Sequence, residues 1–359
     1  MSTILQASVS VPGKVMIAGE YSALTGAPAT AAALDLKLTA TATALGANSI
    51  GGCRVSSDLW SQSHTVADGS SPEDFPATPL LATVANAMTL FGVSDIELKV
   101  SSELSVEYGI GSSSALRLAV LAAFSDIARQ KGSLEPLEAD ELAEIARSAL
   151  SLQRAAQRQA SGYDIATQWL GGIVVSQTSP DVQSWPLALQ RLAGDNISRL
   201  ASFAHVLVGG KGAPTAPAIG TTSSWLSQGE RRNQLDEINT AINTALWSTL
   251  EADTELDPDQ LTCFRDLVNG TRRHRQLFAE APGFPSGLFE RAAQIPGWEE
   301  RWAMKTTGAG GEDAVLIFGS REDAAKVADA VAPLGWHLLT AGFSEIGLRL
   351  ERTIMREEA

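Results

Sequence analysis

Cysteine and histidine are scarce in this sequence. Two cysteines, Cys53 and Cys263, and four histidines occur among 359 residues, and neither type recurs at the close spacing of a metal site. This argues against a metal centre built from these residues. The sequence also lacks a run of 18 apolar residues and a charged start followed by an apolar stretch. We therefore expect no membrane span and no secretory signal, with the cytoplasm as the compartment.

Basic residues are fewer than acidic ones. There are 27 Lys and Arg against 41 Asp and Glu, a formal net charge of -14, which disfavours nucleic acid and acidic membranes as partners. An anionic substrate would need a local basic pocket. Because 44% of residues are hydrophobic and 19% charged, the composition predicts a folded globular protein. The length favours two domains, which we place at residues 1–190 and 191–359.

Hydrophobic periodicity predicts a mixture of strands and helices. Period-two alternation and short apolar runs predict strands at residues 34–42, 96–100, 171–175, 205–208, 314–318, 337–340 and 345–350. Helical spacing predicts helices over residues 80–90, 113–132, 136–157 and 321–331, and more helix between 223 and 275. Because these elements intermix without regular βαβ units, the predicted fold class is α+β.

Three glycine-containing segments have the composition of phosphate-binding loops. In the first, Gly13-Lys14 and Gly19-Glu20 place a cation and a carboxylate at the two ends of one short strand. The second, residues 108–115, reads Tyr-Gly-Ile-Gly-Ser-Ser-Ser-Ala and runs into a helix; glycines, serine hydroxyls and a helix N-terminus all favour phosphate. The third, residues 305–313, combines a lysine, two threonines and glycines. Taken singly, a plain strand, a serine-capped helix and a hairpin loop explain them as well.

In order and separation, the three segments resemble the signature motifs of the GHMP kinase superfamily. These are Pro-Gly-Lys…Gly-Glu, then Gly-x-Gly-Ser-Ser-x-Ala, then Gly-Ala-Gly-Gly-x-Asp near the end, and the resemblance spans nearly the whole chain. It implies the GHMP kinase fold, with an N-terminal domain like domain 2 of ribosomal protein S5 and a C-terminal ferredoxin-like domain. It also implies that ATP and a small alcohol or phosphate substrate bind between the domains.

Two details resemble the phosphomevalonate kinase branch of that superfamily. Gly19-Glu20-Tyr21 is similar to the branch's Gly-Glu-Tyr, where mevalonate kinases and galactokinases usually carry His in place of Tyr. Ser161-Gly162-Tyr163-Asp164 is similar to its Ser-Gly-Phe-Asp, and the Asn-Pro of mevalonate kinases does not precede it. The resemblance implies phosphorylation of phosphomevalonate to diphosphomevalonate in isoprenoid synthesis. Mevalonate or a sugar as acceptor, and a non-catalytic binding protein, are the alternatives.

The resemblance also implies roles for individual residues. Lys14 and Asp164 are the implied catalytic residues, the first stabilising the transferring charge and the second orienting or deprotonating the acceptor. The implied ATP-binding residues are Gly109, Gly111, Ser112, Ser113 and Ser114, of which Ser113 also matches the family's Mg²⁺ contact. The implied substrate-binding residues are Glu20, Tyr21, Ser161, Gly162, Lys211, Gly308, Ala309 and Gly310.

The sequence departs from the family pattern in the second motif, which lacks the Pro often found upstream, and at two further positions. Gln153 stands eleven residues before Asp164, where mevalonate kinases have a Mg²⁺-binding Glu, and a neutral amide binds a hard cation poorly. Glu312 replaces a glycine of the third motif. A carboxylate beside phosphates is unfavourable unless it points away or meets Lys305.

Three arginines near these motifs have two interpretations. Arg117, Arg154 and Arg158 either supply further cations to an anionic substrate or form a solvated helix face. The expected cofactors are ATP and Mg²⁺, and the expected partner is a small phosphorylated or hydroxy-acid substrate. We expect neither nucleic acid nor membrane as a partner, and a monomer or a homodimer.

Overall fold

The larger of two β-sheets contains most strands of the first half of the chain. The computed structural model describes residues 3–45, 49–131, 137–157, 159–209, 215–252, 262–308, 310 and 314–356. The eight-stranded sheet has the order β12-β1-β2-β5-β3-β4, and β6 pairs with both β2 and β7. Its strands are β1 (Thr3–Ala18), β2 (Pro28–Ala44), β3 (Gly52–Ser57), β4 (His64–Ala67), β5 (Ile96–Ser102), β6 (Ile173–Gln177), β7 (Leu189–Leu192) and β12 (Arg349–Arg356).

The long strands β1 and β2 carry the centre of this sheet. Along β2 the side chains of Leu38, Ala40 and Ala42 are buried and alternate with more exposed neighbours, which follows from the period-two pattern of the sequence. The β1–β2 ladder shifts register between Pro12 and Gly13 and again between Met16 and Ala18. Such irregularities redirect side chains, and Lys14 lies between the two.

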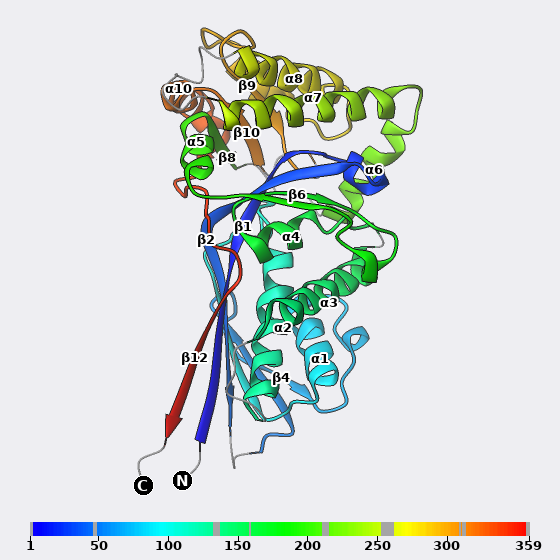
Figure 1. Ribbon diagram of the computed structural model, residues 1–359, viewed down its shortest axis with the longest axis vertical. Helices are drawn as coiled ribbons and strands as arrows, with labels where there is room; N and C mark the ends of the chain where they lie inside the picture. The colour runs from blue at the N-terminus through cyan, green and yellow to red at the C-terminus, as the bar shows by residue number, and fades with distance from the viewer. Residues whose placement is uncertain are drawn as a thin grey trace.

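Four helices lie on one side of β1 and β2 (Figure 1). They are α1 (Pro79–Phe91), α2 (Ser112–Gln130), α3 (Ala139–Gln157) and α4 (Tyr163–Leu170). Helix α2 packs against both strands as well as α1 and α3, and its Leu118, Leu121 and Phe124 are fully buried. Burial of each such side chain stabilises the fold by about 1.5–3 kcal/mol, so the helical spacing of these residues anchors α2 in the core.

The smaller sheet contains four strands in the order β11-β8-β10-β9, with every pair antiparallel. These are β8 (Ala204–Val208), β9 (Ala303–Thr306), β10 (Ala314–Phe318) and β11 (His337–Leu338). The remaining helices are α5 (Asp195–Phe203), α6 (Thr215–Leu226), α7 (Arg231–Glu251), α8 (Thr262–Phe278), α9 (Ser286–Ala292) and α10 (Arg321–Val331). In chain order, β8 to β11 are the first to fourth strands of this sheet. The fourth, β11, lies beside the first, β8, and the third, β10, lies between β8 and the second, β9, as in a ferredoxin-like fold. The predicted α+β class is thereby confirmed.

One cluster of buried apolar side chains joins the two sheets. It extends from Val9 on β1 to Val206 on β8 and Phe264 on α8. A second cluster, which includes the fully buried Trp302, contains residues of the smaller sheet and of helices α9 and α10. The two sheets therefore share a core, which holds their facing ends together.

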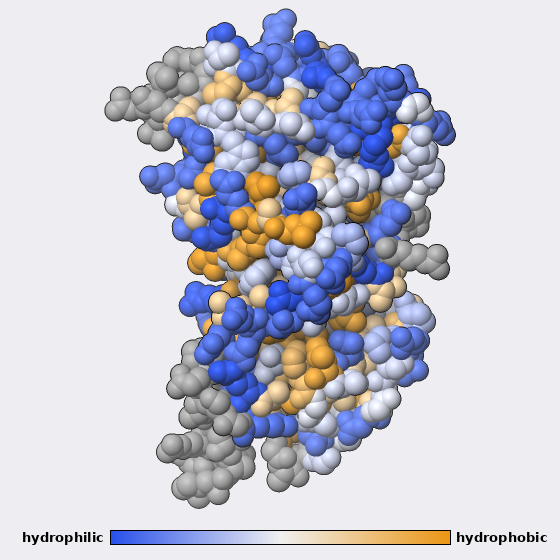
Figure 2. Space-filling view, turned by 45° about the vertical axis from the view of Figure 1, so that its right-hand side comes forward, coloured by the Kyte–Doolittle hydropathy of each residue, from blue (hydrophilic) through white to orange (hydrophobic). Residues whose placement is uncertain are grey.

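The face of the molecule in Figure 2 carries apolar residues in separate groups among polar ones. The large apolar side chains that are exposed are Leu59, Leu90, Val106, Leu187, Leu189, Leu334 and Ile346. Single exposed residues of this kind are normal in globular proteins. Within the described ranges, no helix combines the length and the hydropathy needed to cross a bilayer.

Some element boundaries differ from the predicted ones. The strand expected at residues 345–350 begins at Arg349 and pairs with β1, so the chain returns to the larger sheet. The strand expected at 171–175 begins at Ile173, because Gly171 and Gly172 have positive φ values that end regular pairing. Helix α3 begins at Ala139 rather than at Pro136, and residues 132–136 lie outside the described ones. The domain boundary near residue 190 stays a prediction.

Candidate active site

A cavity of about 570 Å³ is lined by residues from both halves of the chain. The first half contributes β1, the turn before α2, the end of α3 and the start of α4, and the second half contributes Thr307, Gly308 and Ala314. The residues of the sequence-based hypothesis that line this cavity are Lys14, Tyr21, Gly109, Gly111, Ser112, Ser113, Ser114, Ser161, Asp164 and Gly308. Segments far apart in the sequence therefore meet in one cavity.

Strand β1 brings the three glycine-containing segments together. The backbone N–H of Lys14 donates to the carbonyl of Ile110 at 2.8 Å, which fixes the second segment beside the first. The hydroxyl of Thr307 donates to the carbonyl of Met16 at 2.6 Å, which fixes the third segment two residues further along β1. The register irregularities of β1 lie in this same stretch.

The Gly-Ser turn before α2 requires glycine at its last position. Gly111 has a φ of 93° and precedes Ser112, the first residue of α2. A Cβ at this position would lie 2.7 Å from Nε2 of Gln168, which itself donates to the carbonyls of Pro12 and Gly111. With this packing, the free backbone N–H groups at the start of α2 and the serine hydroxyls form a site that favours anions.

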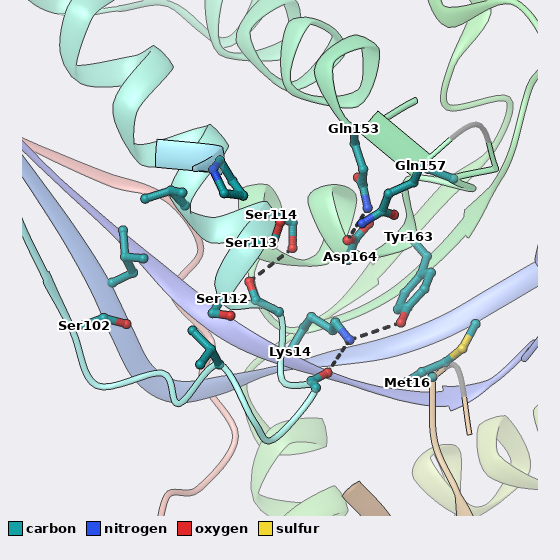
Figure 3. A pocket seen from close by; sticks show the side chains of 18 of the residues that line it. Lys14, Met16, Ser102, Ser112, Ser113, Ser114, Gln153, Gln157, Tyr163 and Asp164 are labelled. Carbon is teal, nitrogen blue, oxygen red and sulfur yellow. Dashed lines mark hydrogen bonds between the residues drawn. The ribbon is translucent and has the colours of Figure 1, made fainter. Parts of the chain in front are cut away.

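The Lys14 ammonium is buried beside Tyr163. The Lys14 side chain is 6% exposed, and its Nζ donates to the Gly109 carbonyl at 2.9 Å and to the Tyr163 Oη at 3.1 Å (Figure 3). The ammonium also lies 5.2 Å from the centroid of the tyrosine ring. Burial raises the pKa of Tyr163, against the opposing effect of Lys14. The phenol therefore remains protonated at neutral pH.

Asp164, at the start of α4, faces Gln153, at the end of α3 (Figure 3). Both side chains are buried, and the Gln153 Nε2 donates to the Asp164 Oδ2 at 2.9 Å. The Gln153 Oε1 is buried and has no hydrogen-bond partner within the described part of the chain. Among those same residues, no group of three His, Cys, Asp or Glu side chains could hold a metal ion.

Arg117 and Arg154 donate hydrogen bonds to backbone carbonyls and do not form a solvated helix face. The buried Arg117 donates from Nη1 to the carbonyl and the hydroxyl of Ser113. Arg154 donates to the carbonyls of Ala160 and Ser179 and so holds the loop that follows β6. Neither arginine is among the described residues that line the cavity.

Glu20 lies apart from the cavity, in a buried cluster. Its carboxylate pairs with Lys305 of β9, and its Oε2 lies 3.7 Å from Nε2 of His274 on α8. Burial raises the pKa of Glu20 and lowers the pKa of Lys305. Burial, with a smaller effect of the Lys305 charge, lowers the pKa of His274 well below its usual value, so this histidine is neutral. The cluster joins the segment after β1 to the smaller sheet and to α8.

Other residues of the hypothesis lie elsewhere. Gly162 caps α4 with a φ of 83° and packs against Trp185, where a Cβ would meet the indole at 2.8 Å. Gly162 and Gly310 are not among the described residues that line the cavity. The positions that fall outside the described residues are Arg158, Lys211, Ala309 and Glu312.

The sequence reasoning missed the apolar wall of the cavity. The apolar wall is formed by residues of β2, of the segment between β3 and β4, of the start of α1, of β5 and of the segment after β5: Leu38, Leu59, Trp60, Pro79, Leu80, Val100 and Val106. No local motif marks them, because they come from separate segments. The alternation at residues 34–42 and 96–100 could only indicate which of them face inward.

Comparison with known proteins agrees with this architecture. Residues 80–172 match the family model described as GHMP kinases N terminal domain, a span that contains the Gly-Ser turn and Asp164. This part of the chain is similar to a GHMP kinase N-terminal domain, and the fold is that of GHMP kinases. No curated protein matches the sequence significantly.

Solved structures with the GHMP kinase fold match along almost the entire chain. The Lin0012 protein from Listeria innocua is 18% identical, with a TM-score of 0.71 over 97% of this chain and 99% of its own. The mevalonate kinase of Methanococcus jannaschii is 16% identical, with a TM-score of 0.69 over 94% and 98%. The phosphomevalonate kinase of Streptococcus pneumoniae, in complex with phosphomevalonate and AMPPNP, is 16% identical, with a TM-score of 0.63 over 96% and 99%. At identities of 16–18%, the similarity to these structures establishes the fold alone.

Proposed function

We propose that this protein is an ATP- and Mg²⁺-dependent kinase that phosphorylates phosphomevalonate to diphosphomevalonate. The observation that carries the proposal is the presence of Lys14 and Asp164 in the same cavity as the Gly-Ser turn at the start of α2. The GHMP kinase fold supports a small-molecule kinase. The resemblance of the segments around Tyr21 and Asp164 to the phosphomevalonate kinase branch favours this acceptor.

The cavity offers separate surfaces to the two parts of a nucleotide. The Gly-Ser turn supplies backbone N–H groups and hydroxyls to the phosphate chain. The apolar wall around Trp60 and Val106 suits the flat, apolar faces of an adenine base. The Streptococcus pneumoniae structure, which has the same fold, contains AMPPNP, and this supports a nucleotide in the corresponding cavity.

Phosphoryl transfer depends mainly on positioning and on neutralising the charge of the transferred group. The Lys14 ammonium is held next to the turn by the Gly109 carbonyl, where it can stabilise charge on the γ-phosphoryl group. An acceptor phosphate is already largely deprotonated at neutral pH. Asp164 therefore orients the acceptor and the Lys14 ammonium, whereas for a hydroxyl acceptor its carboxylate would take the proton.

The residues present fit a magnesium ion that arrives with the nucleotide. Mg²⁺ usually takes one or two carboxylates and completes its shell with phosphates and water. Asp164 offers one carboxylate in the same cavity as the Gly-Ser turn, and the Gln153 side chain, whose Nε2 donates to that carboxylate, is neutral. The predicted ligand Ser113 accepts a hydrogen bond from the Arg117 guanidinium. Because this positive charge repels a cation at the same oxygen, Asp164 is the group that would hold the ion. When bound, Mg²⁺ supplies positive charge to the phosphate oxygens.

A second candidate function is phosphorylation of a neutral hydroxyl on a hydroxy acid such as mevalonate. Among the described residues that line the cavity, Lys14 is the one basic side chain, and Gln153, Gln157 and Gln159 are neutral. A phosphorylated acceptor calls for at least two cations. The second cation expected from the sequence, Lys211, is outside the described residues.

The test is ATP consumption by the purified protein with Mg²⁺ and each of phosphomevalonate, mevalonate, homoserine and galactose. We expect selective turnover of phosphomevalonate. Substituting Lys14→Met should lower kcat by about 10²-fold or more, as for loss of one preorganised charge. Lys99→Met, on the exposed face of β5 and outside the cavity, is the matched control and should leave turnover unchanged. Turnover of mevalonate alone would replace the acceptor, and no turnover of any compound would refute the proposed acceptor and favour either an acceptor outside this panel or a non-catalytic binding protein.

A further inference from the structure

Arg117 is a buried arginine directly behind the Gly-Ser turn. It lies one turn into α2, is 5% exposed, and donates from Nη1 to the Ser113 carbonyl at 3.0 Å and to the Ser113 hydroxyl. Because Ser113 lines the cavity and Arg117 does not, Arg117 can act on a ligand through its hydrogen bonds to Ser113 and through its charge.

The charge of Arg117 has no adjacent counter-ion in the described part of the chain. No carboxylate there lies within 4.0 Å of its guanidinium nitrogens. Burial lowers the pKa of Arg117, while the more distant Asp164 opposes that shift, and an arginine stays protonated in proteins. A buried charge without a close partner is costly. An anion that binds at the turn would reduce this cost.

The same contact decides how the Ser113 hydroxyl can act. A hydroxyl has one proton and two lone pairs. Since the oxygen accepts from Arg117, its own proton points away from the guanidinium, and Ser113 borders the cavity. The hydroxyl proton is thus available to a ligand, together with the one remaining lone pair. The positive end of the hydroxyl, the nearby guanidinium and the N-terminus of α2 all favour a phosphate oxygen at this point over a cation.

We propose that Arg117 is a positioning residue for the nucleotide: it presets the Ser113 hydroxyl as a donor to the phosphate chain, and its buried charge is compensated when that chain binds. The inference rests on the proposed use of ATP but not on the identity of the acceptor. It assigns Ser113 to the phosphates, where the family resemblance assigned it to the metal ion.

The test measures binding and stability without turnover. Calorimetric titration of the full chain with ATP and with inorganic tripolyphosphate, in EDTA, gives the metal-free affinities, and thermal unfolding gives Tm without ligand. Arg117→Met keeps the length of the side chain and removes its charge. We expect its Kd for both anions to rise at least tenfold while its Tm without ligand stays equal to that of the wild type or increases. Arg129→Met, at the other end of α2, is the matched control and should leave both Kd values unchanged.

A second variant keeps the test decisive if Arg117→Met does not fold. Ser113→Ala removes the proposed donor and should raise both Kd values at least fivefold with little change in Tm. The double variant, Arg117→Met with Ser113→Ala, should bind both anions no more weakly than Arg117→Met alone. Both substitutions remove the same hydrogen-bonded arrangement of Arg117 and Ser113, so their effects should not add. A lower Tm of Arg117→Met with unchanged Kd values would assign the arginine to structure alone. Absence of tripolyphosphate binding to the wild type, or unchanged binding to Ser113→Ala, would also overturn the inference. Failure of the acceptor panel with intact tripolyphosphate binding would overturn the proposed function and support this inference.

Discussion

Replacing Gln153 by glutamate would place two carboxyl groups at one hydrogen-bond distance. The Gln153 Nε2 lies 2.9 Å from the Asp164 Oδ2 and donates to it. In the Gln153→Glu variant, an oxygen takes the place of this donor, so a hydrogen bond becomes a contact between like charges. Two ionised oxygens at that separation repel each other by about 6 kcal/mol at an effective dielectric constant of about 20.

Protonation of the new carboxyl limits this cost. Taking up a proton at pH 7 with an ordinary glutamate pKa of about 4.3 costs about 1.36 kcal/mol for each of roughly 2.7 pH units, or about 3.7 kcal/mol. At pH 5.5 the same limit is about 1.6 kcal/mol. Because the pKa of the introduced carboxyl is raised in the folded state, the folded protein binds more protons than the unfolded one above about pH 4.3, and stability falls as the pH rises.

Thermal unfolding of the metal-free protein at both pH values checks this prediction. An unfolding entropy of about 2.1 cal/mol/K per residue over 359 residues gives about 0.75 kcal/mol per kelvin. We therefore expect Gln153→Glu to lower Tm by about 5 K at pH 7 and by about 2 K at pH 5.5. Gln153→Met, which loses the hydrogen bond but adds no charge, should show a loss that does not vary with pH. Equal losses of Tm for both variants at both pH values would refute the reasoning. Excess Mg²⁺ should reduce the difference in Tm from the wild type for Gln153→Glu but not for Gln153→Met.

Three further predictions concern single side chains. Tyr163→Phe keeps the ring beside Lys14 but removes the hydroxyl that accepts a hydrogen bond from the Lys14 ammonium. Steady-state kinetics should show kcat/KM about tenfold lower, equivalent to about 1.4 kcal/mol. An unchanged kcat/KM would show that the hydroxyl has no role in turnover. The pKa of the buried His274 lies well below 6.5 in the folded state, so the unfolded state takes up the proton first. Stability should fall below pH 6.5 by up to about 1.36 kcal/mol per pH unit; His274→Gln should remove this slope in Tm measurements, and persistence of the slope would contradict the burial argument. Burial raises the pKa of Cys53 to about 12, so a thiol reagent should label Cys263 in the native protein and both cysteines in denaturant, whereas native labelling of Cys53 would show that its strand opens.

Features that depend on near neighbours in the sequence could be predicted from it. The alternation at residues 34–42 and 96–100 identified β2 and β5, because one side of each strand is buried. The Gly-Ser turn was identifiable because glycine, serine and a helix start occur within eight residues. The contact between Arg117 and Ser113 was also within reach, since residues four apart on a helix are neighbours.

Features that depend on distant partners could not be predicted. Glu20 and Lys305 are far apart in the sequence, and nothing in either segment says that their charges meet in the core. The substrate-binding role expected for Glu20 stays a prediction, although its carboxylate is buried away from the cavity. The pairing of β12 with β1 is of the same kind, because a period-two pattern indicates a strand but not its neighbour.

This pairing makes the larger sheet depend on residues that are synthesised long after β1. Strand β12 lies on the outer side of β1, with Thr3 opposite Arg356 and Ser10 opposite Arg349. Until residues 349–356 leave the ribosome, β1 is an edge strand with unpaired backbone groups. A fragment that stops short of residue 349 would keep every lining residue of the cavity and yet expose this edge to other chains. Aggregation of such a fragment would therefore report on the sheet edge and not on the active site.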